Sequence, residues 1–249
     1  MHRWGNTPAI DLINIAKNEK DASQDLSIAL VGLCFSSIIM PQTNHFDSAA
    51  SGDLRHVVQT INALPHDCSG HLQVLINDRC LHVVARNIAI LLILGTVSDE
   101  KMAADIALHF WYSVFLPAEY STNIMAIVVS FLLREDPQPQ PLGPHSSMDC
   151  SFPSEMLPLF RRFWSLSMAD AQNEYDRVRT ASSRRDFRDR MYARLKPSHR
   201  LAFQKFRRFG IVLPFGALDA HFNVPNASLF SLDGKWLQTD YADPLGGWE

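Results

Sequence analysis

Apolar and polar residues alternate in two kinds of pattern along the first half of the chain. Mainly apolar runs of strand length occur at residues 26–30 and 72–76, and the first is apolar enough for a central parallel strand. Between them the apolar positions recur at helical spacing until a proline stops the pattern: Leu54, Val57, Val58, Ile61, Leu64 and then Pro65. The order strand, helix, strand predicts an α/β fold with a Rossmann-like core.

Three more helices are predicted before the middle of the chain. Residues 81–94 are apolar nearly all round, which indicates a helix buried on several sides. Ser98 is the expected N-cap of the next helix, whose pattern ends before Pro117. The apolar run 124–133 fits a helix better than a strand.

The second half has a different composition. Six prolines between residues 135 and 158 predict a linker and the main boundary of the chain. We therefore expect a Rossmann-like domain over 1–134, a Pro-rich linker over 135–158, and a basic helical segment with an irregular tail over 159–249. The helical pattern of that last segment is expected to break at Pro197.

Charge is distributed unevenly between these parts. The formal net charge is −3, yet residues 161–208 hold fourteen Arg and Lys against five Asp and Glu, a net +9. Such a segment either packs on the acidic remainder or serves a partner. Asp186 and Asp189, interleaved with the arginines, favour a solvated or intramolecular face over a nucleic-acid surface.

Compartment and membrane signals are few. Cys34, Cys68, Cys80 and Cys150 form no C-x-x-C pair, so we expect reduced, packed thiols in a cytoplasmic protein. The apolar stretch 26–40 is too short for a membrane span and is placed too far inside the chain for a signal peptide. No membrane partner is expected.

A short glycine turn is the best candidate for a ligand site. Ser51, Gly52 and Asp53 open the helix after the first strand, where backbone N–H groups favour an anionic ligand. Asp78 follows the second strand, 26 residues after Gly52, and its carboxylate could accept hydrogen bonds from ribose. Because a dinucleotide fingerprint has three glycines, a plain turn with an N-cap is the alternative.

Several short motifs carry a resemblance to a known family: Trp4-Gly5-Asn6-Thr7-Pro8-Ala9, Ala50-Ser51-Gly52-Asp53-Leu54-Arg55, Ile76-Asn77-Asp78-Arg79, Val83-Val84-Ala85-Arg86-Asn87 and Ala107-Leu108-His109-Phe110-Trp111-Tyr112-Ser113. Residues 1–120 resemble a fungal domain of unknown function that often accompanies MYND-type zinc fingers. That domain is related to the N-terminal domain of dynein axonemal assembly factor three. The resemblance implies a methyltransferase-like fold without established catalytic residues, and the MYND finger itself is missing here.

One departure from this family pattern is an insertion over residues 31–47, between the first strand and the glycine turn. We interpret it as a retained intron or gene-model error; the alternative is that 33–40 replaces 26–30 as the first strand. The ending at Trp248-Glu249 also suggests a fragment of a longer protein.

Two functions follow as hypotheses. The first is a non-catalytic protein-interaction or assembly module. The alternative is a methyltransferase-like enzyme that binds S-adenosylmethionine or a nucleotide at Ser51–Asp53 and Asp78. The ten histidines show no metal-ligand spacing, and His109, within an aromatic helix, is expected to be a hydrogen-bonded core or boundary residue.

Overall fold

The structure is a computed structural model, and its fold is mixed α/β with helices predominating. It describes residues 9–15, 17–18, 23, 25–32, 54–78, 80–134, 138–150, 156–162, 165–182, 185–213 and 217–230. The strands of these residues form three two-stranded sheets.

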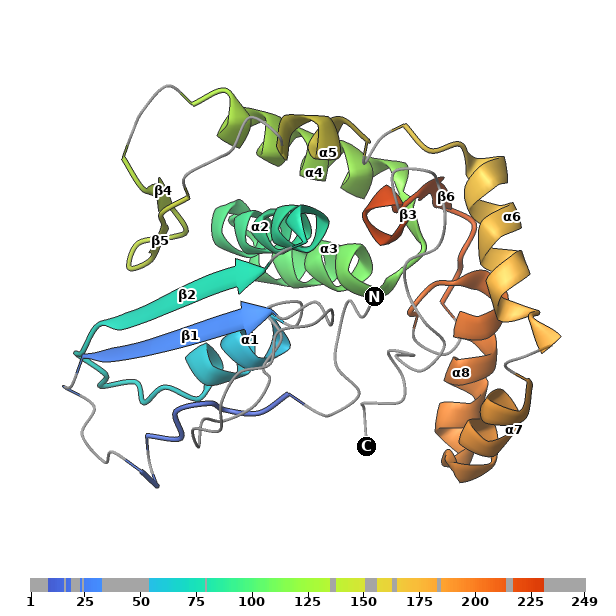
Figure 1. The fold of residues 1–249 in the computed structure, drawn as a ribbon, viewed down its shortest axis with the longest axis horizontal. Coiled ribbons are helices and arrows are strands. Elements are labelled where there is room, and N and C mark those ends of the chain that lie inside the picture. Colours follow the sequence, from blue (N-terminus) through green and yellow to red (C-terminus); the bar gives the residue numbers. More distant parts are fainter. Residues whose placement is uncertain are drawn as a thin grey trace, which may run out of the picture.

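The first sheet belongs to a βαβ unit. Strands β1 (Leu26–Gly32) and β2 (Leu72–Asp78) pair in parallel along their whole length, and α1 (Arg55–Asn62) stands between them in sequence. Figure 1 shows the two strands side by side, with α1 next to β1. Both predicted strands and the intervening helix are confirmed.

The first strand is formed by residues 26–30, as expected, and it extends into the predicted insertion. Val31 and Gly32 continue β1 and pair with Asn77 and Asp78. Whether residues 31–47 are an insertion stays a prediction. The rest of the predicted insertion lies outside the described residues.

Helix α2 (Leu81–Thr96) is the centre of the core. It packs against β2, α3 (Glu100–Tyr112), α4 (Ala118–Leu132) and α5 (Met156–Arg162), and Ile90 and Ile93 are fully buried. The predicted burial of this helix on several sides is confirmed. The N-cap of α3 is Asp99 instead of Ser98, because the Asp99 carboxylate accepts the Met102 N–H.

A short strand was missed between α3 and α4. β3 (Phe115–Pro117) pairs antiparallel with β6 (Phe222–Pro225), which joins residues more than one hundred positions apart. Three residues are too few to show a period-two pattern. The helix predicted over 124–133 is confirmed, but α4 begins at Ala118, directly after Pro117.

The described part of the Pro-rich stretch, residues 138–150, contains a small hairpin of β4 (Gln140–Pro141) and β5 (Ser147–Met148). Leu142 of this hairpin lies against Gly95 of α2, so closely that a Cβ at Gly95 would be 2.6 Å from the Leu142 Cβ. This part of the predicted linker is therefore attached to the central helix. The division of the chain into domains stays a prediction.

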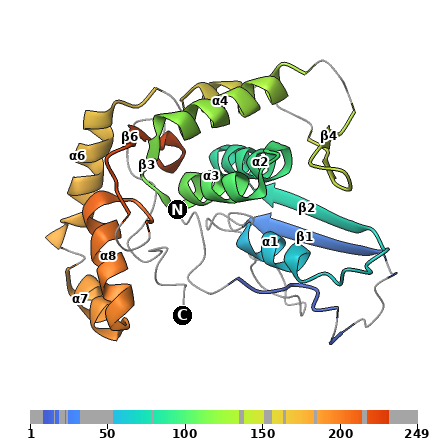
Figure 2. The same cartoon turned by 180° about the vertical axis from the view of Figure 1, so that it is seen from behind.

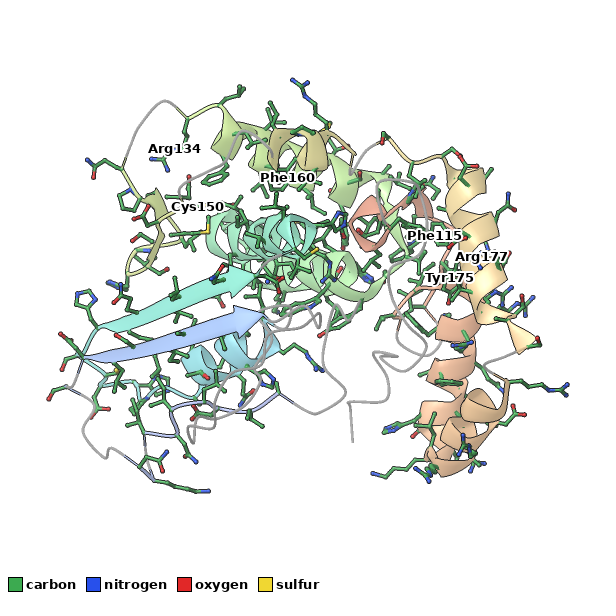
Figure 3. The ribbon with its side chains drawn as sticks, viewed as in Figure 1. Phe115, Arg134, Cys150, Phe160, Tyr175 and Arg177 are labelled. Atoms are coloured by element: carbon green, nitrogen blue, oxygen red, sulfur yellow. The ribbon has the colours of Figure 1, made fainter. Side chains whose placement is uncertain are left out.

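The basic segment folds into helices that share the core of the first half. Beyond α5 they are α6 (Met168–Arg179), α7 (Arg185–Arg194) and α8 (Pro197–Phe209). Figure 2 shows them at one end of the molecule, away from β1 and β2. Figure 3 shows Tyr175 on the side of α6 that faces β3, and Tyr175 and Phe160 belong to the same buried cluster as α2.

The predicted break at Pro197 is confirmed, because α7 ends at Arg194 and a new helix begins at Pro197. Pro197 is the first residue of α8, where its missing N–H costs no hydrogen bond. The helix ends at Gly210, whose φ of 71° is left-handed. After β6, the one-turn 3-10 helix η2 (Ala227–Leu229) is buried.

Candidate functional site

Of the predicted ligand site, the structure places Asp78 at the carboxyl end of β2. The parallel register places Gly32 opposite Asp78, at the edge where open α/β sheets bind ligands. Asp78 is half-buried there, immediately before α2. The other predicted site residues, Ser51, Gly52 and Asp53, lie outside the described residues, so their distance from Asp78 stays untested.

The Asp78 carboxylate takes part in the start of α2. Its Oδ1 accepts the Cys80 N–H at 2.8 Å, which forms an Asx-type turn between β2 and the helix. Cys80, the N-cap of α2, provides no side-chain cap of its own. Asp78 therefore has a local structural role that needs no ligand.

One face of the β1–β2 sheet is exposed. The outward positions alternate along both strands and include Ala29 opposite Leu75, which is 59% exposed. The opposite face carries Ile28 and Val74, which pack against the core. Parallel sheets are usually covered on both faces, so the exposed face of β1 and β2 is unusual.

A second polar site surrounds the C-terminal end of α3, and we call it the α3 clamp: residues 110–114, 210–212 and 226–228. The Asn226 side chain donates from Nδ2 to the carbonyls of Phe110 and Ser113, both at 2.8 Å. Its Oδ1 accepts the Ser228 hydroxyl at 2.6 Å. Asn226 and Ser228 are buried, so every one of these bonds lies away from water.

Backbone bonds complete the α3 clamp. The Val114 N–H donates to the Gly210 carbonyl at 2.6 Å, and the Asn226 N–H donates to the Val114 carbonyl at 2.8 Å. The clamp also reaches α2, because His82 Nε2 lies 2.9 Å from the Ser228 carbonyl oxygen. Three segments distant in sequence are thus fixed around one helix end.

Sequence reasoning missed most of these clamp residues. Asn226 follows a proline in a stretch without periodicity, so nothing in its neighbourhood marks it as buried. His82 and Arg86 offered a better signal, since they are polar residues in an otherwise apolar helix. Arg86 is 1% exposed, and its guanidinium donates to the Trp111 carbonyl.

A chain of polar groups crosses from the surface to the clamp. Asp105 accepts the Tyr120 hydroxyl and lies 3.7 Å from His109 Nε2, while His109 Nδ1 is 2.9 Å from Ser113 Oγ. The His109 ring also packs edge-on against Phe222, with ring centroids 4.8 Å apart. His109 is buried and hydrogen-bonded, as predicted.

Burial determines the protonation states of His109 and Tyr120 among these polar groups. It lowers the pKa of His109 below its ordinary 6.5, although the negative charge of Asp105 opposes the shift. Burial, and then the hydrogen bond to Asp105, raises the pKa of Tyr120 to about 12. His109 is therefore neutral and Tyr120 protonated at neutral pH.

The order Asp105, His109, Ser113 invites comparison with a hydrolytic triad, but the geometry does not support one. Ser113 is fully buried, and its Oγ also accepts the Val212 N–H, so no substrate carbonyl can approach it. The 3.7 Å between Asp105 and His109 exceeds hydrogen-bond length. Asp105, His109, Ser113 and Tyr120 therefore form a structural network.

Several cationic side chains of the basic helices donate hydrogen bonds to backbone carbonyls of the same protein. Arg200 donates to the carbonyls of Leu195 and Ala193, and Arg179 and Arg207 each donate to the other's backbone carbonyl. Lys205 donates to the Ala217 carbonyl. The predicted intramolecular use of the basic segment is thus confirmed for these residues.

Other cations of the same helices face solvent. Arg185, Arg194 and Lys196, on α7 and the turn after it, are exposed. In contrast, the aromatic Phe203 and Phe206 of α8 are buried in the core. The exposed face thus offers positive charge, while these rings are unavailable to stack on nucleic-acid bases.

The described cysteines are free thiols of intermediate exposure: Cys68, Cys80 and Cys150. Burial, and then the neighbouring Asp149, raises the pKa of the Cys150 thiol, which makes its thiolate less available. The prediction of unreactive thiols holds for Cys150, whereas Cys34 lies outside the described residues.

Within the described residues, no group of three or more His, Cys, Asp or Glu side chains could hold a metal ion. None of the helices found in the same ranges combines the length and apolar character needed to cross a membrane.

Part of the chain is similar to a protein named as an assembly factor. Over 112 residues the chain is 29% identical to the Danio rerio protein named dynein axonemal assembly factor 3; the alignment covers 45% of this chain and 19% of that protein. The chain thus spans about a fifth of that relative's length. No solved structure matches it. Residues 3–116 match the family model described as a domain of unknown function, DUF4470, which supports the predicted relation to the assembly factor.

Proposed function

We propose that this protein is a non-catalytic interaction or assembly module, which binds an acidic protein partner through its basic helices. The observation that carries the proposal is the similarity of 45% of the chain to a protein named as an assembly factor. Two polar groups that resemble catalytic residues have structural roles, which also supports the proposal. The Asp78 carboxylate accepts the N–H of the α2 N-cap residue Cys80, and Ser113 is buried in the core.

The basic helices are the surface for this partner. Arg185, Arg194 and Lys196 are exposed, and the guanidinium fork of arginine matches a carboxylate well. Because Phe203 and Phe206 are buried, the surface favours an acidic protein over single-stranded nucleic acid. We therefore expect binding that weakens as salt rises.

Affinity capture from an extract of the source cells, treated with nuclease, tests this proposal. The bait is the full chain, compared with a variant carrying Arg185→Gln, Arg194→Gln and Lys196→Gln. Loss of three charges of about 0.5 kcal/mol each should reduce recovery of the partner about tenfold. Arg177→Gln is the control, because Arg177 is exposed on α6 but paired with Glu174 at 2.7 Å.

Two outcomes would contradict the proposal. One is that no protein is enriched over an unrelated bait. The other is equal enrichment with the triple variant and the wild type, because the basic helices would then have no part in binding. Recovery that disappears after nuclease treatment would indicate a nucleic-acid partner instead.

The second candidate is a methyltransferase-like enzyme on a Rossmann-like core. The parallel βαβ unit favours it, with Asp78 at the carboxyl end of β2. S-adenosylmethionine would then bind at Ser51–Asp53 and Asp78. Calorimetric titration into folded protein tests this: saturable binding that Asp78→Ala abolishes supports the enzyme, and absence of heat argues against it.

A further inference from the structure

Residues 226–228 form the one glycosylation sequon of the chain. Asn226-Ala227-Ser228 is the only match to Asn-x-Ser/Thr in the 249 residues, and its middle residue is not proline. In proteins that meet the glycosylation machinery, such a tripeptide is an acceptor for an oligosaccharide and lies on a surface loop. Here the tripeptide is buried instead: Asn226 is 1% exposed and Ser228 0%.

Both hydrogens of the Asn226 side-chain amide are used by the fold. They are donated from Nδ2 to the carbonyls of Phe110 and Ser113, each at 2.8 Å. The amide oxygen accepts the hydroxyl of Ser228, the third residue of the same sequon, at 2.6 Å. The atom to which a glycan would be attached, Nδ2, is therefore the atom that holds the end of α3.

The surrounding backbone places the sequon inside the molecule. β6 ends at Pro225, which pairs with Phe115 of β3, and Figure 1 shows these two strands side by side. The Asn226 N–H donates to the Val114 carbonyl at 2.8 Å, and residues 227–229 then form the turn of η2. All three sequon residues are buried, so a sugar ring on Asn226 would have to displace packed elements.

We infer that Asn226 is a latent N-glycosylation acceptor, and that glycosylation and folding exclude each other at this residue. In the reaction, Nδ2 attacks C1 of a lipid-linked oligosaccharide: an N–C bond forms, the C–O bond to the pyrophosphate breaks, lipid pyrophosphate leaves, and the amide loses one proton. One N–H then remains for two buried carbonyls at the end of α3, and leaving a buried carbonyl unsatisfied is costly. The native fold therefore forms only where the chain meets no oligosaccharyltransferase before residues 226–228 reach α3.

The folded protein should be protected from the same reaction. Purified full chain is incubated with an oligosaccharyltransferase and a lipid-linked oligosaccharide, beside a synthetic peptide of residues 222–230. We expect the peptide to be modified at least about a hundredfold faster, because a stable protein exposes its buried groups only in a small unfolded fraction. Equal rates for the two acceptors would overturn the inference.

Translation of the full chain behind a cleavable signal peptide, with and without microsomes, tests the effect of the glycan on folding. With microsomes we expect a product with one glycan on Asn226, which peptide-N-glycosidase removes. Trypsin should digest this product at least about tenfold faster than the chain made without microsomes, because a buried hydrogen bond and the packing around it are lost.

Removal of the sequon should restore folding in microsomes. Ser228→Ala abolishes the acceptor sequence and keeps both Nδ2 donors of Asn226, so this variant should be equally resistant to trypsin with and without microsomes. Ala227→Pro serves if Ser228→Ala does not fold, because a middle proline also abolishes the sequon and suits the first residue of η2.

A matched control places the same tripeptide on the surface. Thr180→Asn, introduced together with Ser228→Ala, creates an Asn-Ala-Ser sequence with Ala181 and Ser182 after α6. Both Thr180 and Ser182 are exposed, so a glycan there should leave the resistance to trypsin unchanged. This control separates the effect of a glycan on Asn226 from the effect of a glycan in general.

Three results would overturn the inference in the translation experiment. They are a glycan on Asn226 that leaves resistance to trypsin unchanged, a wild-type chain that acquires no glycan in microsomes, and an equal loss of resistance when the glycan is at position 180. The inference is independent of the proposed function, because partner capture depends on α7 whereas this reaction concerns the end of α3.

Discussion

The β1–β2 edge and the α3 clamp both contain polar residues at the ends of secondary-structure elements, yet they differ in how those residues are held. At the edge, Asp78 makes a local bond two residues away and the sheet has an exposed face. In the clamp, Asn226 bonds to groups 113 and 116 residues away, all buried. The clamp is therefore suited to fixing the fold, and the edge remains open to a ligand or partner.

The family match ends within the region that the clamp holds together. The match ends at residue 116, yet the α3 terminus within it is bonded to residues 210–212 and 226–228. Buried polar groups must keep their partners, so residues 3–116 alone would expose carbonyls and apolar surface that the C-terminal segment covers. The C-terminal residues of the clamp thus cover the end of α3, while the division of the chain into domains stays a prediction.

The largest expected effect comes from Asn226→Ala. The substitution removes both donors to α3 and the acceptor for Ser228, and leaves those buried groups unsatisfied at about 1–3 kcal/mol each. We expect a loss of about 3–5 kcal/mol in the free energy of unfolding, measured by urea denaturation. Asn223→Ala, on the exposed side of β6, should change it by less than about 0.5 kcal/mol. Equal effects of the two variants would contradict the role of the clamp.

Gly210→Ala should destabilise the same region through backbone strain and a close contact. Its φ of 71° is unfavourable for alanine, and the new Cβ would lie 2.6 Å from Val114 Cγ2. We expect a loss of about 2–4 kcal/mol in the same denaturation experiment. Gly143→Ala separates the two causes, because Gly143 also has positive φ, but its nearest neighbour, Ser146 Oγ, is at 3.9 Å. If Gly143→Ala costs as much, the contact with Val114 is not important.

The clamp should also make stability depend on pH. The folded-state pKa of His109 is lowered, so the unfolded chain binds more protons once pH falls below about 6.5. Its contribution to stability is complete above that pH and decreases as pH falls toward the folded-state pKa, by at most about 1.4 kcal/mol per pH unit. Urea denaturation between about pH 7 and pH 5 should show a shallower slope for His109→Gln. An unchanged slope would mean that His109 does not contribute.

The sequence predicted these two regions unequally, for a physical reason. β1, β2 and α2 follow from local apolar patterns in the residues themselves, although these patterns do not show that one face of the β1–β2 sheet is exposed. The pairing of β3 with β6, and the bonds of Asn226, depend on contacts between segments more than one hundred residues apart. In the candidate site, the position of Asp78 at the end of a strand could be predicted from the sequence. Its hydrogen bond to Cys80 could not, because that bond depends on local turn geometry. The break at Pro197, in contrast, could be predicted, because a proline interrupts a helix and fits the first position of the next one.

The smallest expected effect lies on the open face of the sheet. Leu75 is 59% exposed, so Leu75→Thr should change the free energy of unfolding by less than about 0.5 kcal/mol, because threonine suits a strand and little apolar area is lost. Val74→Thr, one residue earlier, places a hydroxyl on the face that packs against the core and should cost about 1–2 kcal/mol. Urea denaturation of this pair compares the two faces directly. If Leu75→Thr cost as much as Val74→Thr, the outer face would be covered in solution, and the β1–β2 edge would resemble the clamp more than a binding surface.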